Sequence, residues 1–301
     1  MKDGVSVLVT DLDNTLFDWV DIWHRSFSAL LAELHRASGV PHERLLDEIR
    51  AIHRRYGTSE YAFLAEELGC VRESMPREQW EAAVRAANQA GRDARHAATR
   101  LYPGVQRTLK QLRDRGVLII GYTESSSFYT GRRVRRLGLD GLLQILYSPP
   151  DHELPAGFTP EQVRGHACDY YEFKHTRHYH TPAGELKPNP DLLRAILDGV
   201  GASPAQAVYV GDSPMKDIAM AQDAGVTDVL ALYGRAQDRD AYELLRRVTH
   251  WTEEDVARER RILERGDIRP SYVLKRSFAE LPGLFPFVAF TGRDPAATAA
   301  A

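Results

Sequence analysis

The stretch that decides the fold is VSVLVTDLDNTLF, Val5–Phe17. It opens with a short apolar run interrupted only by Ser6, which is typical of a strand buried on both faces of a parallel sheet. Asp11 and Asp13 follow at a spacing of two, so both side chains can project from the carboxyl end of this strand, where ligands bind in open α/β sheets. Two carboxylates this close repel each other, which favours a bound divalent cation such as Mg²⁺. The alternative is a turn-capping aspartate beside one that faces water.

Composition excludes several classes of protein. The chain has 301 residues, of which 43% are hydrophobic and 27% charged, as expected of a soluble globular protein of about two structural units. A formal net charge of -3 predicts no general attraction to nucleic acid or to an anionic membrane. Two cysteines supply neither a disulfide framework nor a four-cysteine metal site. With no leader pattern and no apolar run of about 18 residues, we expect a cytoplasmic protein.

The hydrophobic period changes after the opening strand. Apolar residues recur at three- and four-residue steps through residues 18–98, which predicts an inserted helical domain. An alternation of strands and helices then resumes. Strands are predicted over 117–122, 142–147, 207–210, 227–233 and 272–274, and helices over 105–115, 126–137 and 191–200. The pattern predicts an α/β fold with a doubly wound parallel sheet, whose core covers residues 1–17 and 99–285.

Three further segments interrupt or end this core. Residues 148–185 are rich in Pro, His and Tyr and predict a second insertion, with one hairpin across 170–180. Residues 235–265 predict a charged helical insertion, and residues 293–301 a disordered tail. The histidines of the second insertion are interpreted as exposed hairpin residues rather than zinc ligands. Four arginines between 132 and 136 are interpreted as the solvated basic face of a helix.

Polar residues follow several of the predicted strands. The carboxyl ends of parallel strands meet at one edge of a sheet, so residues distant in sequence are expected to converge there. These residues are Asp11, Asp13, Thr123, Lys187, Asp212 and Asp217. Together they match what phosphoryl transfer requires: a nucleophile, a proton-transfer group, a divalent cation and donors for the phosphoryl oxygens. No G-x-G-x-x-G follows a strand and no P-loop motif occurs, which disfavours dinucleotide binding and P-loop chemistry.

The ordered set of motifs resembles the haloacid dehalogenase superfamily of hydrolases. The motifs are Asp11-Leu12-Asp13-Asn14-Thr15, Thr123 after a hydrophobic strand, Lys187 in LKPNP, and GDSPMKD over Gly211–Asp217. The resemblance implies a Rossmann-like core, with residues 18–98 where this superfamily carries its helical cap. Residues 148–185 fall where a second, smaller cap can be inserted.

The resemblance also implies roles for four aspartates. Asp11 would be the nucleophile that forms an aspartyl-phosphate. Asp13 would protonate the leaving oxygen and later deprotonate water, and its main-chain carbonyl would bind Mg²⁺. Asp212 would supply metal ligands together with Asp11. Asp217 would hold the metal's water shell or orient Lys187.

Four more residues are implied to bind the substrate's phosphate. Thr123 would donate to the phosphoryl group, as would the amides of Glu124 and Ser125, while Lys187 would balance its charge. Glu124 departs from the family pattern, since a polar amide is frequent there, and it adds a negative charge near an anionic substrate.

These features predict a Mg²⁺-dependent phosphomonoester phosphatase acting on a small phosphorylated metabolite, with no nucleic acid or membrane partner. Two alternatives stay open: a phosphotransferase such as a mutase, and a non-catalytic ligand-binding protein on the same fold. Asp13 argues against halide removal, because the resembled dehalogenase branch lacks that second acid. The absence of lysine between Lys2 and Lys110 argues against the phosphonate-cleaving branch, which uses a cap lysine. The sequence predicts neither the identity of the substrate nor the oligomeric state.

Overall fold

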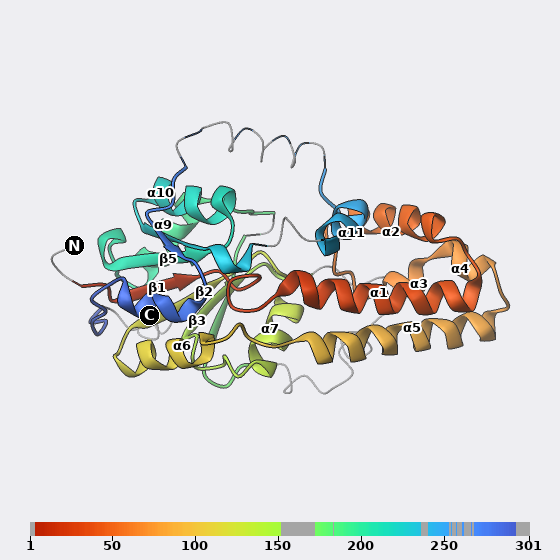
Figure 1. Cartoon of the computed structure of the whole chain (residues 1–301), viewed down its shortest axis with the longest axis horizontal. Helices are drawn as coiled ribbons and strands as arrows, with labels where there is room; N and C mark the ends of the chain where they lie inside the picture. The colour runs from red at the N-terminus through yellow and green to blue at the C-terminus, as the bar shows by residue number, and fades with distance from the viewer. Residues whose placement is uncertain are drawn as a thin grey trace. The chain divides into compact units, whose positions relative to one another are not determined.

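Among the residues that the structure describes, seven parallel strands form one sheet with β1 (Val7–Thr10) at its centre (Figure 1). The strand order is β4-β3-β2-β1-β5-β6-β7. The other strands are β2 (Leu118–Tyr122), β3 (Ile145–Ser148), β4 (Arg177–His180), β5 (Ala207–Gly211), β6 (Thr227–Ala231) and β7 (Tyr272–Leu274). All residues of β1, β2 and β5 are buried, which explains why these three strands read as uninterrupted apolar runs. The predicted α/β fold with a doubly wound parallel sheet is confirmed.

The register of the central strands aligns their carboxyl ends. Thr10, the last residue of β1, lies opposite the next-to-last residues of β2 and β5. The loops that follow these three strands therefore begin at the same edge of the sheet. Those loops carry Asp11, Thr123 and Asp212.

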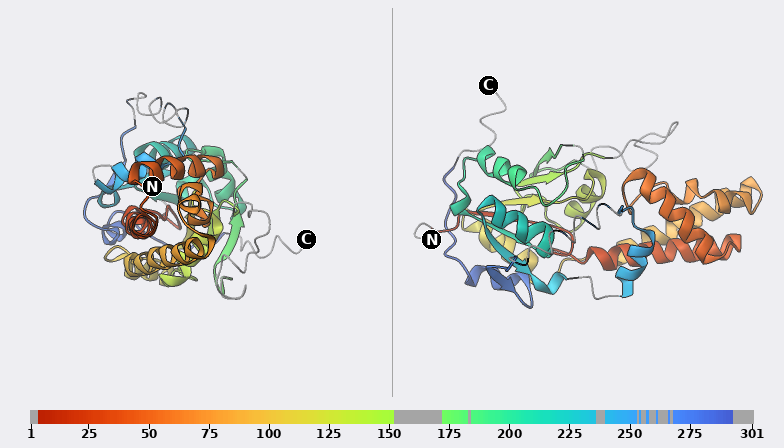
Figure 2. Two further views of the ribbon diagram at one scale, coloured as in Figure 1. Left: turned by 90° about the vertical axis from the view of Figure 1, so that its right-hand side faces the viewer. Right: turned by 90° about the horizontal axis from the view of Figure 1, so that it is seen from above.

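Helices cover both faces of the sheet (Figures 1 and 2). On one face, α9 (Pro190–Gly199) and α10 (Ala219–Ala224) bury apolar side chains against β1, β2 and β5. The opposite face carries α6 (Val105–Asp114) and α7 (Ser127–Arg136). Short helical turns complete this part of the chain: η2 (Pro204–Gln206), η3 (Pro214–Ile218), η4 (Leu232–Gly234) and η5 (Phe278–Gly283).

The computed structural model of the chain describes residues 4–151, 172–182, 184–235, 240–252 and 268–292, together with residues 254, 257, 261 and 266. The predicted tail and large parts of the two later insertions lie outside these residues. The chain forms two compact units. The sheet unit comprises Met1–Phe17, Leu101–Arg235 and Arg261–Ala301, and the helical unit comprises Asp18–Arg100 and Ala236–Arg260.

The helical unit is built from amphipathic helices. They are α1 (Trp19–Ser38), α2 (His42–Tyr56), α3 (Leu64–Glu67), α4 (Gly69–Glu73), α5 (Arg77–Ala98) and α11 (Asp240–Val248). The first is capped at its N-terminus by Asp18, whose carboxylate accepts from the Asp21 amide at 2.9 Å, and at its C-terminus by Gly39 in the left-handed conformation. The last comes from the charged 235–265 segment and packs against α1 and α2.

The predicted hairpin across residues 170–180 is wrong in its second half. Arg177–His180 form β4, a parallel edge strand paired with β3. The carboxylate of Asp140 accepts from three successive amides just before this strand, those of Lys174, His175 and Thr176, and so fixes where the strand enters. Most of β4 is exposed, as suits an edge strand, so it lacks the apolar run that marks the central strands.

Two predicted strand boundaries differ from the structure by two residues or more. The strand predicted to begin at Leu142 begins at Ile145, because the amides of Leu142 and Leu143 bond to the carbonyl of Leu139 in a turn. The strand predicted over 227–233 ends at Ala231, and η4 begins at the next residue, Leu232.

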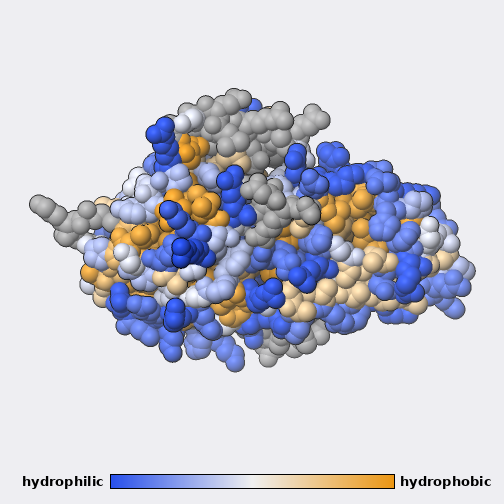
Figure 3. Space-filling view, in the orientation of Figure 1, coloured by the Kyte–Doolittle hydropathy of each residue, from blue (hydrophilic) through white to orange (hydrophobic). Residues whose placement is uncertain are grey.

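None of the helices among the described residues combines the length and the apolar character needed to cross a bilayer. On the face drawn in Figure 3, hydrophilic residues surround the hydrophobic ones across the described surface.

Candidate active site

Asp11 stands at the carboxyl end of β1. Its amide donates to the carbonyl of Val210 at 2.8 Å, which continues the pairing with β5 by one residue and holds the backbone in place. The side chain of Leu12 is buried in the core, so Asp11 and Asp13 project from the same side of the segment. Asn14 then adopts a left-handed conformation (φ 59°), which Asn tolerates better than most residues.

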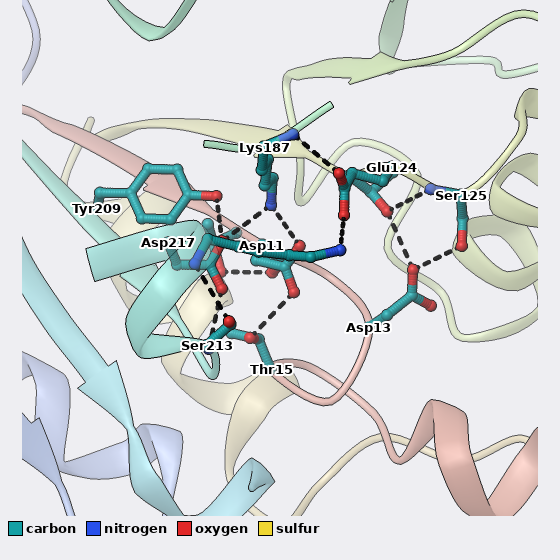
Figure 4. Close-up of polar contacts among 12 residues, drawn as sticks. Asp11, Asp13, Thr15, Glu124, Ser125, Lys187, Tyr209, Ser213 and Asp217 are labelled. Carbon is teal, nitrogen blue, oxygen red and sulfur yellow. Dashed lines mark hydrogen bonds and ion pairs between the residues drawn. The ribbon is translucent and has the colours of Figure 1, made fainter. Parts of the chain in front are cut away.

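The turn at Asn14 brings Thr15 back to Asp11. The Thr15 hydroxyl donates to Oδ2 of Asp11 at 3.1 Å (Figure 4). On the other side of the turn, η4 supports it: the Tyr233 hydroxyl donates to the Thr15 carbonyl at 2.7 Å. A Cβ on Gly234 would lie 1.7 Å from the Asn14 carbonyl oxygen, so only glycine permits this approach.

Lys187 lies between two carboxylates (Figure 4). Its ammonium donates to Oδ1 of Asp11 at 2.7 Å and to Oδ1 of Asp217 at 3.0 Å, and the residue is only 4% exposed. The Tyr209 hydroxyl donates to the same oxygen of Asp217 at 3.0 Å. Burial alone would lower the pKa of Lys187, but the two carboxylates outweigh it and hold the pKa well above its ordinary value. Lys187 is therefore a fixed positive charge.

Asp217 reaches this cluster because of Gly211. The GDSPMKD stretch turns from β5 into η3, and a Cβ on Gly211 would lie 2.3 Å from Cγ of Asp217. Only glycine lets the carboxylate fold back over the end of the strand. The amide of Ser213 then donates to Oδ2 of Asp217 at 3.1 Å.

Three carboxylates converge beside Lys187. Each of Asp11, Asp212 and Asp217 offers an oxygen, and these oxygens lie within 4.8 Å of one another. Burial raises the pKa of Asp11 to about 7, with added repulsion from Asp217 and Asp13 and opposing attraction from Lys187. The pKa of Asp212 is raised well above its ordinary value, by the displacement of water from it and by the negative charges of Asp217 and Asp11. A divalent cation would relieve this repulsion, and an all-carboxylate donor set suits Mg²⁺.

The carboxylate of Asp13 is held elsewhere. Its Oδ2 accepts from the hydroxyls of Thr123 at 3.0 Å and Ser125 at 2.7 Å, and its Oδ1 lies 3.3 Å from a guanidinium nitrogen of Arg133. The side chain of Asp13 is thus not a member of the three-carboxylate group. The contribution of its main-chain carbonyl to a metal site stays a prediction.

Glu124 braces two segments of the site. One of its carboxylate oxygens accepts from the Lys187 amide at 2.8 Å, and the other accepts from the Lys216 ammonium at 2.7 Å. Burial opposes the charged form of Glu124, but Lys216 and Lys187 outweigh it and lower the pKa of the carboxyl group. Its negative charge is thereby balanced, which accounts for an acidic side chain in the loop that is predicted to bind phosphate.

The structure thus brings all eight predicted site residues into one region of the sheet unit, in two groups. Asp11, Lys187, Asp212 and Asp217 form the first, and Asp13, Thr123 and Ser125 the second, with Glu124 bonded to the Lys187 backbone. Their chemical roles stay predictions, as do the phosphate contacts of the Glu124 and Ser125 amides.

Sequence reasoning missed several residues that hold the site together. Thr15 and Lys216 lie inside quoted motifs, so their positions were a usable signal. Tyr209 lies in a buried strand whose sequence pattern indicates only a core position. The pattern does not predict that its hydroxyl donates to Asp217. Arg133 belongs to the predicted solvated basic face of α7, and for this residue the prediction is wrong: it is 4% exposed and pairs with Asp13.

The histidines of residues 175–180 form no metal site among the residues that the structure describes, where the three aspartates are the one convergent group. His178 is not a freely exposed hairpin residue, because its Nε2 lies 2.8 Å from the Ser148 hydroxyl. Burial, together with the neighbouring His180, lowers its pKa to about 4.

Two phosphatases are among the proteins of known function that this chain is similar to. A glyceraldehyde 3-phosphate phosphatase of Methanopyrus kandleri is 24% identical over 242 residues, which cover 78% of this chain and 88% of that protein. A phosphoglycolate phosphatase of Rhodospirillum rubrum is 48% identical over 54 residues, 18% of this chain and 22% of that protein.

Solved structures share the fold. A 2-haloacid dehalogenase from Pseudomonas syringae matches with a TM-score of 0.51 at 20% identity, covering 93% of this chain and 97% of that chain. A phosphatase of the same superfamily from Thermococcus onnurineus matches with a TM-score of 0.50 at 18% identity over the same shares. The model of the haloacid dehalogenase-like hydrolases matches residues 5–225, and the chain therefore belongs to that family.

Proposed function

We propose that the protein is a Mg²⁺-dependent phosphomonoester phosphatase that works through a phosphorylated Asp11. The observation that carries the proposal is the setting of this carboxylate: it ends the central strand and lies against Lys187 and Thr15 beside two further carboxylates. A nucleophile held by donors on both oxygens loses little entropy when a phosphate ester binds in front of it.

In the first half-reaction, an oxygen of Asp11 bonds to phosphorus while the bond from phosphorus to the ester oxygen breaks. The protonated carboxyl group of Asp13 gives its proton to the departing oxygen, so an alcohol leaves and Asp13 becomes a carboxylate. In the second half-reaction, Asp13 takes a proton from water as the water oxygen bonds to phosphorus. The bond to Asp11 breaks, its carboxylate is restored, and inorganic phosphate is released.

The remaining polar groups would bind and orient the phosphoryl group. The hydroxyl of Thr123 and the amides of Glu124 and Ser125 would donate to its oxygens, and Lys187 would offset its charge. Asp11 and Asp212 would hold Mg²⁺, with Asp217 and the Asp13 carbonyl completing or orienting the site. When bound, Mg²⁺ would supply charge neutralisation for the phosphoryl oxygens and for the clustered carboxylates.

We propose a small phosphorylated metabolite as the substrate, in a cytoplasmic setting. Both curated relatives described above carry the names of phosphatases of small phosphate esters, which supports this class. The net charge of -3 gives no support to nucleic acid as a partner.

A panel of small phosphate esters tests the proposal, with release of inorganic phosphate as the readout. We expect turnover with Mg²⁺, none after chelation, and recovery on adding Mg²⁺ back. Asp11→Asn should abolish turnover and leave the far-UV circular dichroism unchanged, and rapid quenching of the wild type should show phosphate on the peptide that carries Asp11. Transfer to a sugar hydroxyl without free phosphate would instead indicate a phosphotransferase. Silence across the panel would contradict the proposal and favour a ligand-binding protein.

A further inference from the structure

Arg133 is a buried cation that contacts Asp13 and is not part of any of the sequence motifs quoted above. It lies on α7 at 4% exposure, and one terminal nitrogen is 3.3 Å from Oδ1 of Asp13 and 3.3 Å from Oγ of Ser125. The rings of Phe17 and Tyr129 lie 5.9 Å and 5.8 Å from its guanidinium carbon. A guanidinium buried at this depth is costly unless it is paired, and these two rings restrict where it can turn.

The contacts of Asp13 are divided between its two oxygens. Oδ2 accepts from Thr123 and Ser125, and Oδ1 is the oxygen that faces Arg133. In the proposed function, Thr123 and the loop that carries Ser125 turn their donors to the phosphoryl group. Oδ2 would then be released to carry the proton, while Arg133 keeps its contact with Oδ1.

We propose that Arg133 is a positioning residue for Asp13: it holds one carboxyl oxygen so that the other can exchange a proton with the leaving group and then with water. This inference rests on the proposed function. Arginine suits the task because it stays charged at any working pH and presents several donors in a fixed plane, so it does not compete for the transferred proton.

Leaving-group dependence separates positioning of a general acid from a structural role. An alkyl phosphate needs its departing oxygen protonated, whereas p-nitrophenyl phosphate releases a stable anion that needs little help. Because kcat/KM reports only the steps through the first irreversible bond cleavage, it is insensitive to the later hydrolysis of the phosphorylated Asp11.

We expect Arg133→Met to lower kcat/KM on the order of 10- to 100-fold for glycerol 3-phosphate but less than about threefold for p-nitrophenyl phosphate. Arg136→Met, the same change at an exposed arginine of α7, should affect neither substrate. Equal losses on both substrates would show that Arg133 binds phosphate or merely holds the fold. No loss on either substrate would also overturn the inference.

A double-mutant cycle keeps the test independent of folding. In an Asp13→Asn background there is no acid left to position, so adding Arg133→Met should cost less than about twofold on either substrate. A full second loss there would overturn the inference. If Asp13→Asn itself shows no leaving-group dependence, the acid role in the proposed function fails, and the positioning role fails with it.

Should Arg133→Met not fold, Arg133→Lys should give the same selective loss at smaller size, and an unselective loss again contradicts positioning.

Discussion

His53 should make the helical unit sensitive to acid. The residue lies on α2 with no exposed surface, and its Nδ1 is 2.7 Å from the Val248 carbonyl of α11. Its Nε2 is buried without a hydrogen-bond partner, so protonation there would place an unpaired charge in the core. Burial lowers the pKa of His53 to about 4, although the bond to Val248 opposes the shift.

The sign and size of the effect follow from proton linkage. An unfolded chain has a histidine pKa of about 6.5, so between about pH 6.5 and about pH 4 the unfolded state binds more protons than the folded state. The stabilisation from His53 is therefore complete above about pH 6.5 and is lost as the pH falls toward 4. The whole gap between the two pKa values corresponds to about 3 kcal/mol, of which about 2 kcal/mol disappears between pH 7 and pH 5.

Tryptophan fluorescence offers a selective assay. All four tryptophans, at positions 19, 23, 80 and 251, fall within the helical unit. Urea titrations followed by this signal at a series of pH values give the free energy of unfolding of that unit. We compare the wild type with His53→Asn, whose side-chain nitrogen can replace Nδ1 as the donor to Val248.

The variant should be less stable at neutral pH, yet its unfolding free energy should fall by about 2 kcal/mol less than that of the wild type between pH 7 and pH 5. His96→Asn, at an exposed position of α5, is the matched control and should follow the wild-type pH dependence. Parallel pH profiles for the wild type and His53→Asn would refute the assignment of acid sensitivity to His53.

Three further predictions concern the sheet unit. Lys187→Met should destabilise the sheet unit by about 3–5 kcal/mol, because buried carboxylates lose their counter-charge. In urea titrations followed by circular dichroism, Mg²⁺ should restore part of the lost stability. Unchanged stability would contradict the central role of the ammonium. Glu124→Gln and Lys216→Met should each lower the free energy of unfolding. The double variant should lose about 0.5–1 kcal/mol less than the sum of the two single losses, a modest coupling because both side chains are partly exposed. Strictly additive losses would mean that the ion pair contributes nothing to stability. Asp217→Asn should weaken Mg²⁺ binding on the order of tenfold, as measured by calorimetry. An unaltered affinity would indicate that Asp217 only pairs with Lys187 and does not contribute to the metal site.

Much of the sheet was predictable because burial leaves a signature in sequence. The central strands are covered on both faces, so they appear as apolar runs whose ends are marked by polar residues. The strand Arg177–His180 carries no such signature, since an edge strand is half exposed and its place depends on the distant carboxylate of Asp140. Long-range capping of this kind is invisible in local periodicity.

The same distinction applies to the site. Convergence of Asp11 and Asp212 follows from strand topology, which is why motifs at strand ends were sufficient to predict it, whereas Asp217 joins them through the turn at Gly211. The partners of each group depend on side-chain packing. The sequence of an arginine cluster on a helix does not predict which arginine is buried. Arg133 is the buried one because it packs against two aromatic rings and pairs with Asp13.

The late arrival of α11 has a consequence for synthesis. Translation delivers β1 through β6 before Asp240–Val248 emerge, so the helical unit cannot reach its final packing until these strands have been synthesised. Until then, the ring of His53 lacks the carbonyl of Val248, and the faces of α1 and α2 that receive α11 stay uncovered. A nascent chain that stalls before Asp240 would therefore expose these uncovered helix faces, to which a chaperone could bind. Residues 18–100 expressed alone would expose the same faces.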